Sequence, residues 1–578
     1  MCGIFGYTNF DNRELERARI SLQKLRHRGP DQWNDYFDDK IYIGHQRLSI
    51  LDLSEDGSQP MISDNQDVII AINGEIYNFQ KLKEELNSKY IFKSCSDSEV
   101  VLHGYIEWGI DGLLDKIDGM YAISIYDKRV GELYLVRDRT GIKPLYYSRI
   151  NNQVSWGSEL KALQSFYCNY DLEYDYTAFY DFLTYLYIPT PKTMYKNVYK
   201  LEPGHYLKVD LSSNEVVNIN YWTLEINKCD DDLELAKEKI RNLVEESINE
   251  QMVADVPVGF FLSGGMDSST VVAIASLHHT NLNTFSIGFT DKKHDETHFA
   301  ELIANKYNTE HDSKILSQEE TSNMFYKIKE WYDEPFGDTS CFPTFLVSDF
   351  AKAKSTVVLT GDGGDEIFGG YNWYREFERI KVNKFKVPMP KIFKSLVGSL
   401  KTKQGKIGSA ARKFEVEFLL DDLEVYCKLM GGMLKDEKSM YKESWGIDDE
   451  YDDYWYFRKF YREDLDLYTR LQFLDFHTYL HDAILTKVDR VSMAVSLECR
   501  VPFLKRELID YSFSLNDDIR IHNGELKGIM KEAFGDLLPR EIIDRDKKGF
   551  NIPTKTWHDI FKGKRKQEKI LEEFNIKN

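Results

Sequence analysis

The chain has 578 residues, of which 42% are hydrophobic and 29% charged, and its formal net charge is -20 at pH 7. This length predicts two or three domains, and the composition is typical of a globular protein. The acidic charge argues against a general nucleic-acid or anionic-membrane binder, because neutralising phosphates requires clustered Lys and Arg.

The first third of the chain has the pattern of strands joined by turns. Val68–Ile72 is a short apolar run that ends in the turn signal Asn73-Gly74. The runs Gly119–Tyr126 and Gly131–Val136 predict a β-hairpin. Ser94–Gly104 begins polar and becomes apolar, which predicts a capped helix.

A polar, turn-rich segment then separates two patterns. We predict a first domain over residues 2–212, a linker over 213–231 and a second domain over 232–578. In the second domain, helices such as Leu235–Gln251 alternate with short apolar runs, which predicts a parallel α/β sheet. These runs are Val256–Leu262, Thr284–Phe289 and Thr356–Thr360.

The remainder of the chain is rich in helical patterns. Beyond Phe377 the apolar residues recur at helical spacing, which predicts a helical C-terminal part. The lysine-rich stretch 379–406 is most simply a solvated face. The charged tail after Gly563 is expected to fray.

Cys2 directly follows the initiator Met. Removal of Met1, which a small second residue allows, would leave a thiol and a free α-amine on Cys2. This pairs a nucleophile with a base that titrates near neutral pH. An ordinary buried cysteine is the alternative.

Several short polar motifs follow Cys2. They are Arg26–Asp31 (RHRGPD), His45–Ile50 (HQRLSI), Asn73–Asn78 (NGEIYN), Ser96–Glu99 (SDSE), Arg137–Tyr147 (RDRTGIKPLYY) and Ser158–Leu163 (SELKAL). In this order they resemble the N-terminal-nucleophile glutaminase domain of the glutamine-dependent asparagine synthetases. The resemblance implies an αββα sandwich in which Cys2 forms a thioester with glutamine.

The resemblance also assigns the glutamine-binding residues. They are Arg47, Leu48, Asn73, Gly74, Glu75 and Asp97. Arg47 can hold the substrate carboxylate by a bidentate fork, and Glu75 and Asp97 can accept from its ammonium. Asn73 and the Gly74 N–H would donate to the oxyanion. The alternatives are a surface ion pair for Arg47, a plain turn at Asn73-Gly74 and a helix N-cap at Asp97.

A glycine-rich loop, Ser263–Ser268 (SGGMDS), lies between an apolar run and a helix start. Backbone N–H groups in such a turn form a nest for anions, and the helix dipole adds to it. The loop is not a Walker A loop, because no Gly-Lys-Ser/Thr follows. It resembles the PP-loop, which holds the pyrophosphate cut from ATP; a purely structural turn is the alternative.

A second motif, Thr360–Tyr371 (TGDGGDEIFGGY), is dense in acids that would repel one another without a cation. By resemblance, Asp267 and Asp365 are Mg²⁺ ligands. The family often has Glu where this chain has Asp362; that residue is thought to support formation of the acyl-adenylate and its reaction with ammonia. The resemblance assigns ATP and pyrophosphate binding to Leu262, Ser263, Gly264, Gly265, Asp267, Ser268, Ile287, Gly288, Thr360 and Gly361.

A third block, Lys487–Ala494 (KVDRVSMA), supplies a candidate catalytic lysine. A helix would place Lys487 on a face with Ala483, Ile484 and Val491, where the alternative is a snorkelling lysine. The resemblance instead places it over the ATP phosphates. The predicted catalytic set is therefore Cys2, Asn73, Gly74, Asp362 and Lys487. Two further positions bear on the resemblance: Lys505 replaces a usual Asp, and Lys547–Pro553 (KKGFNIP) matches a C-terminal family signature.

The cysteines indicate the compartment. They are seven in number, widely spaced and without a C-x-x-C pair, so structural zinc and redox dithiol sites are not expected. No signal peptide or membrane-spanning apolar run is visible. We expect a cytoplasmic protein that binds neither nucleic acid nor membrane, with a homodimer kept as one alternative for its assembly.

Together the motifs predict an AMP-forming carbon–nitrogen ligase. By resemblance, ATP, L-aspartate and L-glutamine would give AMP, pyrophosphate, L-asparagine and L-glutamate, with Mg²⁺ as cofactor. Ammonia would pass between the sites along a shielded path, because protonation in water removes its nucleophilicity. Two rivals stay open: a same-fold amidotransferase for another carboxylate, such as a sugar acid, with acceptor contacts near Asp338–Ser340, and a non-catalytic paralogue. A PP-loop tRNA-modifying enzyme fits the acidic charge less well.

Overall fold

The computed structural model describes residues 1–168, 172–292, 294–317, 324–386, 406–545 and 563–576, and the single positions 320, 397, 400 and 561. The predicted signature Lys547–Pro553 and most of the lysine-rich stretch 379–406 therefore lie outside the described residues.

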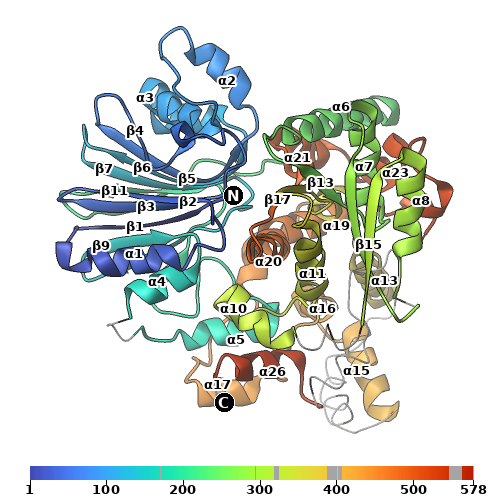
Figure 1. Ribbon diagram of the computed structural model, residues 1–578. Coiled ribbons are helices and arrows are strands. Elements are labelled where there is room, and N and C mark those ends of the chain that lie inside the picture. The colour runs from blue at the N-terminus through green and yellow to red at the C-terminus, as the bar shows by residue number, and fades with distance from the viewer. Residues whose placement is uncertain are drawn as a thin grey trace.

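The N-terminal part is a sandwich of two antiparallel six-stranded sheets, shown in blue to teal in Figure 1. The first sheet has the order β10-β8-β9-β1-β3-β2 and the second β12-β11-β7-β6-β5-β4. The strands are β1 (Gly3–Thr8), β2 (Gln32–Phe37), β3 (Ile41–Arg47), β4 (Met61–Ile62), β5 (Val68–Ile76), β6 (Gly119–Asp127), β7 (Glu132–Arg137), β8 (Tyr146–Ile150), β9 (Gln153–Gly157), β10 (Val198–Lys200), β11 (His205–Asp210) and β12 (Val216–Asn220).

Helices cover both outer faces of this sandwich. α1 (Leu15–Gln23) and α4 (Leu160–Phe166) pack on the first sheet, and α2 (Phe79–Leu86) and α3 (Asp97–Lys116) on the second. Apolar side chains such as Ile4, Ile43 and Ile69 form the core between the sheets. The predicted αββα sandwich is confirmed, and we call this unit the sandwich domain. Its last strand, β12, lies inside the segment predicted as a linker, so the exact division stays a prediction.

The predicted turn at Asn73-Gly74 is wrong. β5 continues through both residues, with Asn73 opposite Ala122 and Gly74 opposite Tyr121 in β6. Gly74 is needed there for a packing reason, because a Cβ would lie 2.0 Å from the Met120 carbonyl oxygen. The predicted hairpin is confirmed as β6 and β7, and the predicted capped helix as α3, whose N-cap is Ser96.

The second unit contains a five-stranded parallel sheet with the order β15-β14-β13-β16-β17, as predicted. Its strands are β13 (Val258–Phe261), β14 (Asn283–Phe289), β15 (Glu310–Leu316), β16 (Val357–Leu359) and β17 (Glu498–Arg500). The helices packed around them include α6 (Leu233–Gln251), α7 (Met266–His278), α8 (Thr297–Tyr307) and α11 (Cys341–Ala351). We call this unit, with its helical C-terminal part, the parallel-sheet domain.

Helices make up most of the rest of this domain. They are α10 (Ile328–Tyr332), α12 (Gly364–Phe368), α13 (Asn372–Lys386), α15 (Lys406–Phe418), α16 (Asp422–Leu429), α17 (Ser439–Ser444), α18 (Trp455–Phe460), α19 (Leu467–Asp475), α20 (Thr486–Met493), α21 (Arg506–Ser514), α22 (Asp517–Arg520), α23 (Gly528–Phe534), α24 (Arg540–Ile543) and α26 (Lys566–Glu573). Within the chain of the sandwich domain, between α4 and β10, lies α5 (Tyr176–Tyr185), which contacts α26 of the parallel-sheet domain.

Two helical details differ from expectation. Residues Phe476–Leu485, just before α20, form a π-helix, so Ala483 and Ile484 do not share an α-helical face with Lys487. The tail expected to fray forms α26, because Ile570 and Leu571 are buried in the main core cluster.

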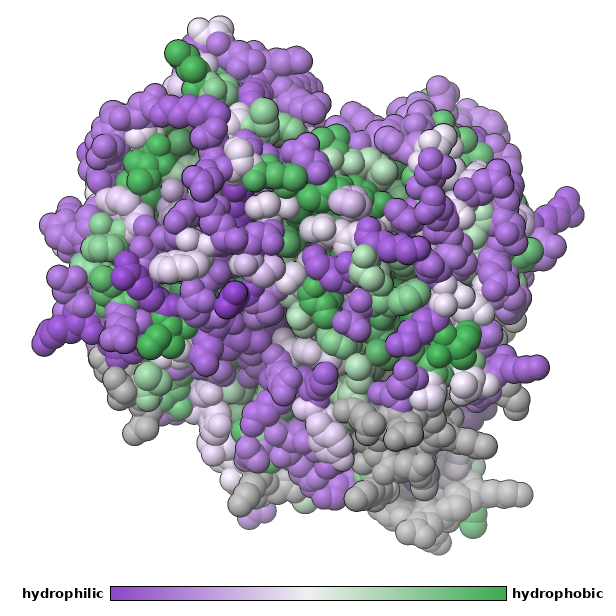
Figure 2. All heavy atoms as spheres, in the orientation of Figure 1, coloured by the Kyte–Doolittle hydropathy of each residue, from purple (hydrophilic) through white to green (hydrophobic). Residues whose placement is uncertain are grey.

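The two units share a core. One apolar cluster joins Met1 and Leu48 of the sandwich domain to Val501 and Leu504 of the parallel-sheet domain. Hydrophilic residues cover most of the face seen in Figure 2, with hydrophobic residues between them. Within the described ranges, the structure contains no helix whose length and apolarity would let it cross a membrane.

Candidate active sites

The first predicted group of residues gathers where the two sheets of the sandwich domain meet. Cys2 precedes β1, and Arg47 ends the neighbouring strand β3, since Gly3 pairs with Gln46. β5 contacts both strands and carries Asn73 and Glu75. The fold therefore brings together residues that are up to 95 positions apart in the chain, including Asp97 at the start of α3.

Asn73 faces the candidate nucleophile directly. The Cys2 backbone N–H donates to Asn73 Oδ1 at 3.0 Å, which fixes the orientation of the fully buried amide. The Asn73 Nδ2 atom is buried and has no hydrogen-bond partner among the described residues. A buried donor without a partner costs free energy, so it is suited to a negative charge that develops during a reaction.

The Cys2 thiol lies in a mixed electrostatic environment. Burial raises its pKa, whereas the terminal ammonium of Met1, the Leu48 backbone N–H and Arg47 lower it. In the described chain Met1 is present, and its ammonium pairs with Glu498 of β17 at 2.8 Å. The α-amine of Cys2 is then part of a peptide bond, so the predicted role for it as a base requires removal of Met1.

Arg47 is buried, which excludes the alternative of a surface ion pair. Its guanidinium donates to the carbonyl oxygens of Ser54 at 2.8 Å and Leu51 at 3.4 Å, and to that of Asp52. The loop 51–54 thus holds the fork in place. A substrate carboxylate would have to replace some of these carbonyl contacts.

Two buried carboxyl groups complete this site. Asp97 accepts from the Ile76 N–H at 2.7 Å, and burial raises its pKa to about 6. Burial, together with the nearby Asp97, also raises the pKa of Glu75 well above its usual value. Glu75 lies 3.6 Å from Arg500 of β17, so the other domain contributes a cation to this group. Desolvated carboxyls of this kind gain from binding an ammonium.

The second group lines a cavity of about 1170 Å³ at the carboxyl ends of the parallel strands, the usual ligand-binding edge of such sheets. The predicted residues that line it are Leu262, Ser263, Gly265, Asp267, Ser268, Ile287, Thr360, Gly361, Asp362, Asp365 and Lys487. Gly264 and Gly288 are absent from the lining. Both glycines are closely packed against neighbouring residues instead. A Cβ at Gly264 would lie 2.6 Å from Ala300 N, and a Cβ at Gly288 would lie 2.3 Å from Asp295 Oδ1.

The glycine-rich loop joins β13 to α7 as predicted. Gly264 has φ +68°, a left-handed conformation that favours glycine, and Gly265 is the N-cap of α7. Ser263 Oγ lies 3.1 Å from Ser268 Oγ and accepts from the Gly265 N–H at 3.2 Å. The hydroxyls and the helix N-terminus therefore face the cavity together, an arrangement that binds phosphate.

The two predicted metal ligands converge on one cation. Lys527 Nζ lies 2.5 Å from Asp267 and 2.6 Å from Asp365. Burial alone would favour neutral Lys527, but these two carboxylates outweigh it and raise its pKa. Sequence reasoning missed Lys527. The available signal was a lysine at the start of α23, where the helix dipole disfavours a positive charge.

Lys487 lines the same cavity. It is buried and 3.7 Å from Asp338, the carboxylate predicted near the acceptor. Burial opposes its charge, but Asp338 and Asp362 outweigh this and raise its pKa. Lys487 therefore stays protonated rather than snorkelling to solvent. Close by, burial and Asp365 raise the pKa of Glu366 to about 8.

Lys505, the departure from the family pattern, has a structural explanation. Its ammonium pairs with Glu250 at 2.8 Å and Glu246 at 3.2 Å on α6. It does not line the cavity.

Comparison with known proteins gives two family matches and several relatives. Residues 1–222 match the glutamine amidotransferase domain family, and residues 239–573 match the asparagine synthase family. The chain is 34% identical to glutamine-hydrolysing asparagine synthetase 1 of Bacillus subtilis (strain 168), over 96% of this chain and 88% of that protein. It is 38% identical to a putative glutamine-hydrolysing asparagine synthetase 2 of Methanocaldococcus jannaschii, over 67% and 79%. Amidase chry2 of Gibberella zeae is 25% identical, over 96% and 90%.

Proposed function

We propose that this chain, which belongs to the family of glutamine-hydrolysing asparagine synthetases, makes L-asparagine from L-aspartate with glutamine as nitrogen donor. The family is one of ATP-dependent, amide-forming ligases, and the resemblance inferred from the motifs is confirmed. In the proposed reaction, ATP is split to AMP and pyrophosphate. We propose that this reaction takes place in the cytoplasm.

The observation that carries the proposal is the presence of two separate constellations of polar residues on one shared core. In the sandwich domain, Cys2 lies beside the unpartnered Asn73 donor. In the parallel-sheet domain, the glycine-rich loop, which contains Asp267, lines the same cavity as Asp365 and Lys527. Neither set fits a non-catalytic paralogue, because buried charges and unpartnered donors cost stability unless they serve a ligand.

In the sandwich domain, the proposed steps follow from the residues present. The Cys2 thiolate attacks the side-chain amide of glutamine, and the Asn73 amide and Gly74 N–H stabilise the oxyanion. Loss of ammonia leaves a thioester, which water hydrolyses to glutamate. Leu48, Met120 and Ile142 join the apolar cluster that continues into the parallel-sheet domain. An apolar route would keep ammonia unprotonated until it reaches the acyl-adenylate.

Mg²⁺ is proposed as the cofactor of the second site. Asp267 and Asp365 already converge on one cation, which shows that their carboxylates can share a positive charge. Mg²⁺ is usually bound through one or two carboxylates plus substrate phosphates, so this pair fits. The metal would neutralise pyrophosphate oxygens. Within the described residues no group of three or more His, Cys, Asp or Glu side chains forms a metal cage, so phosphates would supply the other ligands.

The nucleophile is tested by Cys2→Ala. This variant should lose glutamine-dependent synthesis and keep synthesis from ammonium salts, because the second site does not use the thiol. The same split is expected when Met1 is retained, since the α-amine is then in a peptide bond. Product formation from glutamine at the wild-type rate in Cys2→Ala would refute the assignment.

The acceptor is tested by nucleotide release. Purified protein with ATP, Mg²⁺, an ammonium salt and L-aspartate should release AMP, not ADP, with an equal yield of asparagine. The second candidate is a same-fold amidotransferase for another carboxylate, which the 25% identity to amidase chry2 along nearly the whole chain keeps open. It predicts AMP release with a different acid and none with aspartate.

A further inference from the structure

One wall of the cavity belongs to a segment without regular structure. Residues 333–340 join α10 to α11, and we call them the acceptor segment. Asp338 and Ser340 line the cavity, and Asp338 lies 3.7 Å from Lys487. The Ser340 hydroxyl donates to Asp338 at 2.7 Å, which fixes the carboxylate. The position of this segment therefore determines where the Asp338 carboxylate lies relative to Lys487 in the cavity that the glycine-rich loop also lines.

The sandwich domain holds the acceptor segment along its length. The contacts are Lys161 N–H to Asp333 Oδ2 at 3.1 Å, Lys200 Nζ to Glu334 Oε1 at 2.7 Å, and Gly337 N–H to the Leu186 carbonyl at 2.7 Å. The last contact is close, because a Cβ at position 337 would lie 2.9 Å from that carbonyl oxygen. A wall of the synthetase cavity is thus built against the domain that hydrolyses glutamine.

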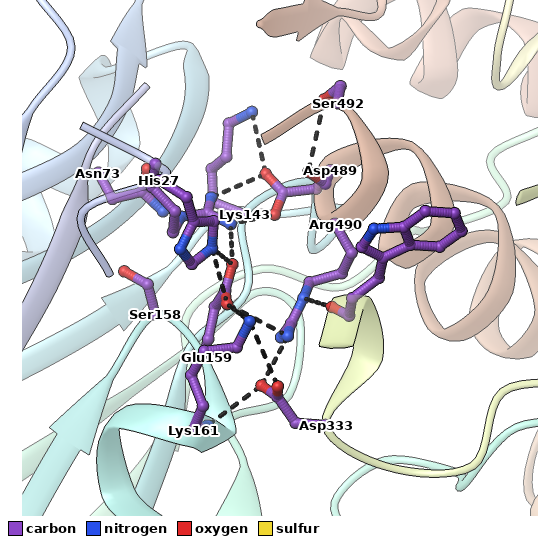
Figure 3. Close-up of polar contacts among 12 residues, drawn as sticks. His27, Asn73, Lys143, Ser158, Glu159, Lys161, Asp333, Asp489, Arg490 and Ser492 are labelled. Carbon is purple, nitrogen blue, oxygen red and sulfur yellow. Dashed lines mark hydrogen bonds and ion pairs between the residues drawn. The ribbon is translucent and has the colours of Figure 1, made fainter. Parts of the chain in front are cut away.

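Glu159 is the centre of the buried charges at this contact (Figure 3). Its side chain is 1% exposed and lies 3.2 Å from Arg490 and 3.1 Å from Lys161. His27 and Arg28 of the sandwich domain also contact it, at 3.1 and 2.9 Å. Burial opposes its ionisation, but Arg490, His27 and Lys161 outweigh this and hold the pKa of Glu159 well below its usual value.

Arg490 links Glu159 to the acceptor segment, because its guanidinium pairs with both Glu159 and Asp333. Its Nη2 atom lies 2.6 Å from Asp333 Oδ2, and its Nε donates to the Trp331 carbonyl at 2.8 Å. Asp333 has φ +61°, a left-handed conformation that costs a non-glycine residue roughly 1 kcal/mol or more. The ion pairs to Asp333 offset that cost. Arg490 is also one turn of α20 beyond Lys487, so one arginine orients both sides of the acceptor region.

We propose that Glu159 of the sandwich domain is a positioning residue for the acceptor site, because through Arg490 it holds the acceptor segment in register with Lys487. The affinity for the acceptor then depends on the sandwich domain even when ammonia replaces glutamine and Cys2 is idle. The inference rests on the proposed function in one respect, namely that the acceptor acid binds in this part of the cavity.

Steady-state kinetics with an ammonium salt test this role. Glu159→Gln keeps the size of the side chain and removes its charge. Its KM for L-aspartate should rise about tenfold, equivalent to about 1.4 kcal/mol, while its KM for ATP changes less than about twofold. Lys200→Met, which releases Glu334, should act in the same direction. Combining Glu159→Gln with Asp333→Asn should raise the KM for aspartate less than the two single effects together, because both residues act through Arg490.

Asp181→Asn is the matched control. Asp181 is an equally buried carboxylate of α5 that accepts from Tyr451 at 2.8 Å and Trp455 at 3.1 Å in the parallel-sheet domain. It has no contact with the acceptor segment, so the KM for aspartate should stay at the wild-type value. If the substitutions only loosened the interface in general, the KM for aspartate would rise equally in Glu159→Gln and Asp181→Asn. That result would contradict the proposal.

Hydrogen exchange decides the question without any acceptor. The amides of residues 333–340 should exchange faster in Glu159→Gln and Lys200→Met than in wild type, and unchanged in Asp181→Asn. If wild-type protein released no AMP with aspartate, the proposed acceptor would be refuted, and exchange alone would decide on positioning. Unchanged exchange in both variants, or a fall in kcat with unchanged KM for aspartate, would overturn the inference.

Discussion

Asn73 shows how one side chain is prepared for a reaction. Its oxygen is fixed by the Cys2 N–H, and its buried nitrogen has no partner in the described structure. Removing one oxyanion donor typically costs about 10²–10³ in kcat. Asn73→Ala should therefore lower glutamine hydrolysis by about that factor and leave ammonia-dependent synthesis unchanged. Parallel assays of glutamate and AMP release check this, and an equal fall in both would mean that the substitution acts through stability.

Asp97 predicts a pH limit for glutamine use. Burial raises its pKa to about 6, so the carboxylate is charged above this pH and neutral below it. The neutral form cannot pair with the glutamine ammonium. The kcat/KM for glutamine should therefore fall as the pH drops through about 6, with the neighbours Glu75, Glu498 and Arg500 shaping the curve. With glutamine, Asp97→Asn should be poorly active at every pH and should not show the fall in kcat/KM near pH 6. Synthesis from ammonia, which does not use this site, serves as the control.

At the scale of elements, the glycine-rich loop can be tested apart from its chemistry. Gly264 combines φ +68° with crowding, because a Cβ would lie 2.4 Å from Phe299 Cβ. Gly446 has φ +64° and no atom within 4 Å of such a Cβ. Gly446→Ala should cost only the backbone conformation, about 1 kcal/mol, and keep pyrophosphate release. Gly264→Ala should cost more and abolish release, as seen by urea unfolding and a pyrophosphate assay. Equal behaviour of the two variants would contradict the assigned loop.

The elements also show what sequence reasoning can reach. The glycine-rich loop and the acid-rich motif could be predicted because their residues are contiguous and their glycines have local causes. Asn73-Gly74 was misjudged as a turn, because the close approach of β6 that requires Gly74 is a long-range property. Lys527 is 162 residues from Asp365 in the chain, and the lysine at the start of α23 gave no indication of which carboxylates it would pair with. The same holds for Glu159 and Arg490.

At the scale of the whole molecule, the two domains are joined by more than a linker. The terminal ammonium of Met1 pairs with Glu498, and Arg28 donates to both oxygens of Asp489 at 2.8 and 3.0 Å. The strand β17 touches both sites, since the Arg500 side chain approaches Glu75 while its carbonyl accepts from the Thr360 N–H at 2.9 Å. Either site can therefore respond to the state of the other through a few buried contacts.

This shared interior predicts that the domains unfold together. Residues 1–222 alone would lose the buried ion pairs that Arg28 makes with Asp489 and Glu159 makes with Arg490. They would also expose Met1, Leu48 and Ile142, which are buried in the shared cluster. Calorimetry of the full chain should show one cooperative transition, and residues 1–222 expressed alone should melt at a clearly lower temperature. Two separate transitions in the full chain, one of them matching the isolated domain, would show that the interface adds little stability. The charge network around Glu159 would then have to be maintained for catalysis alone.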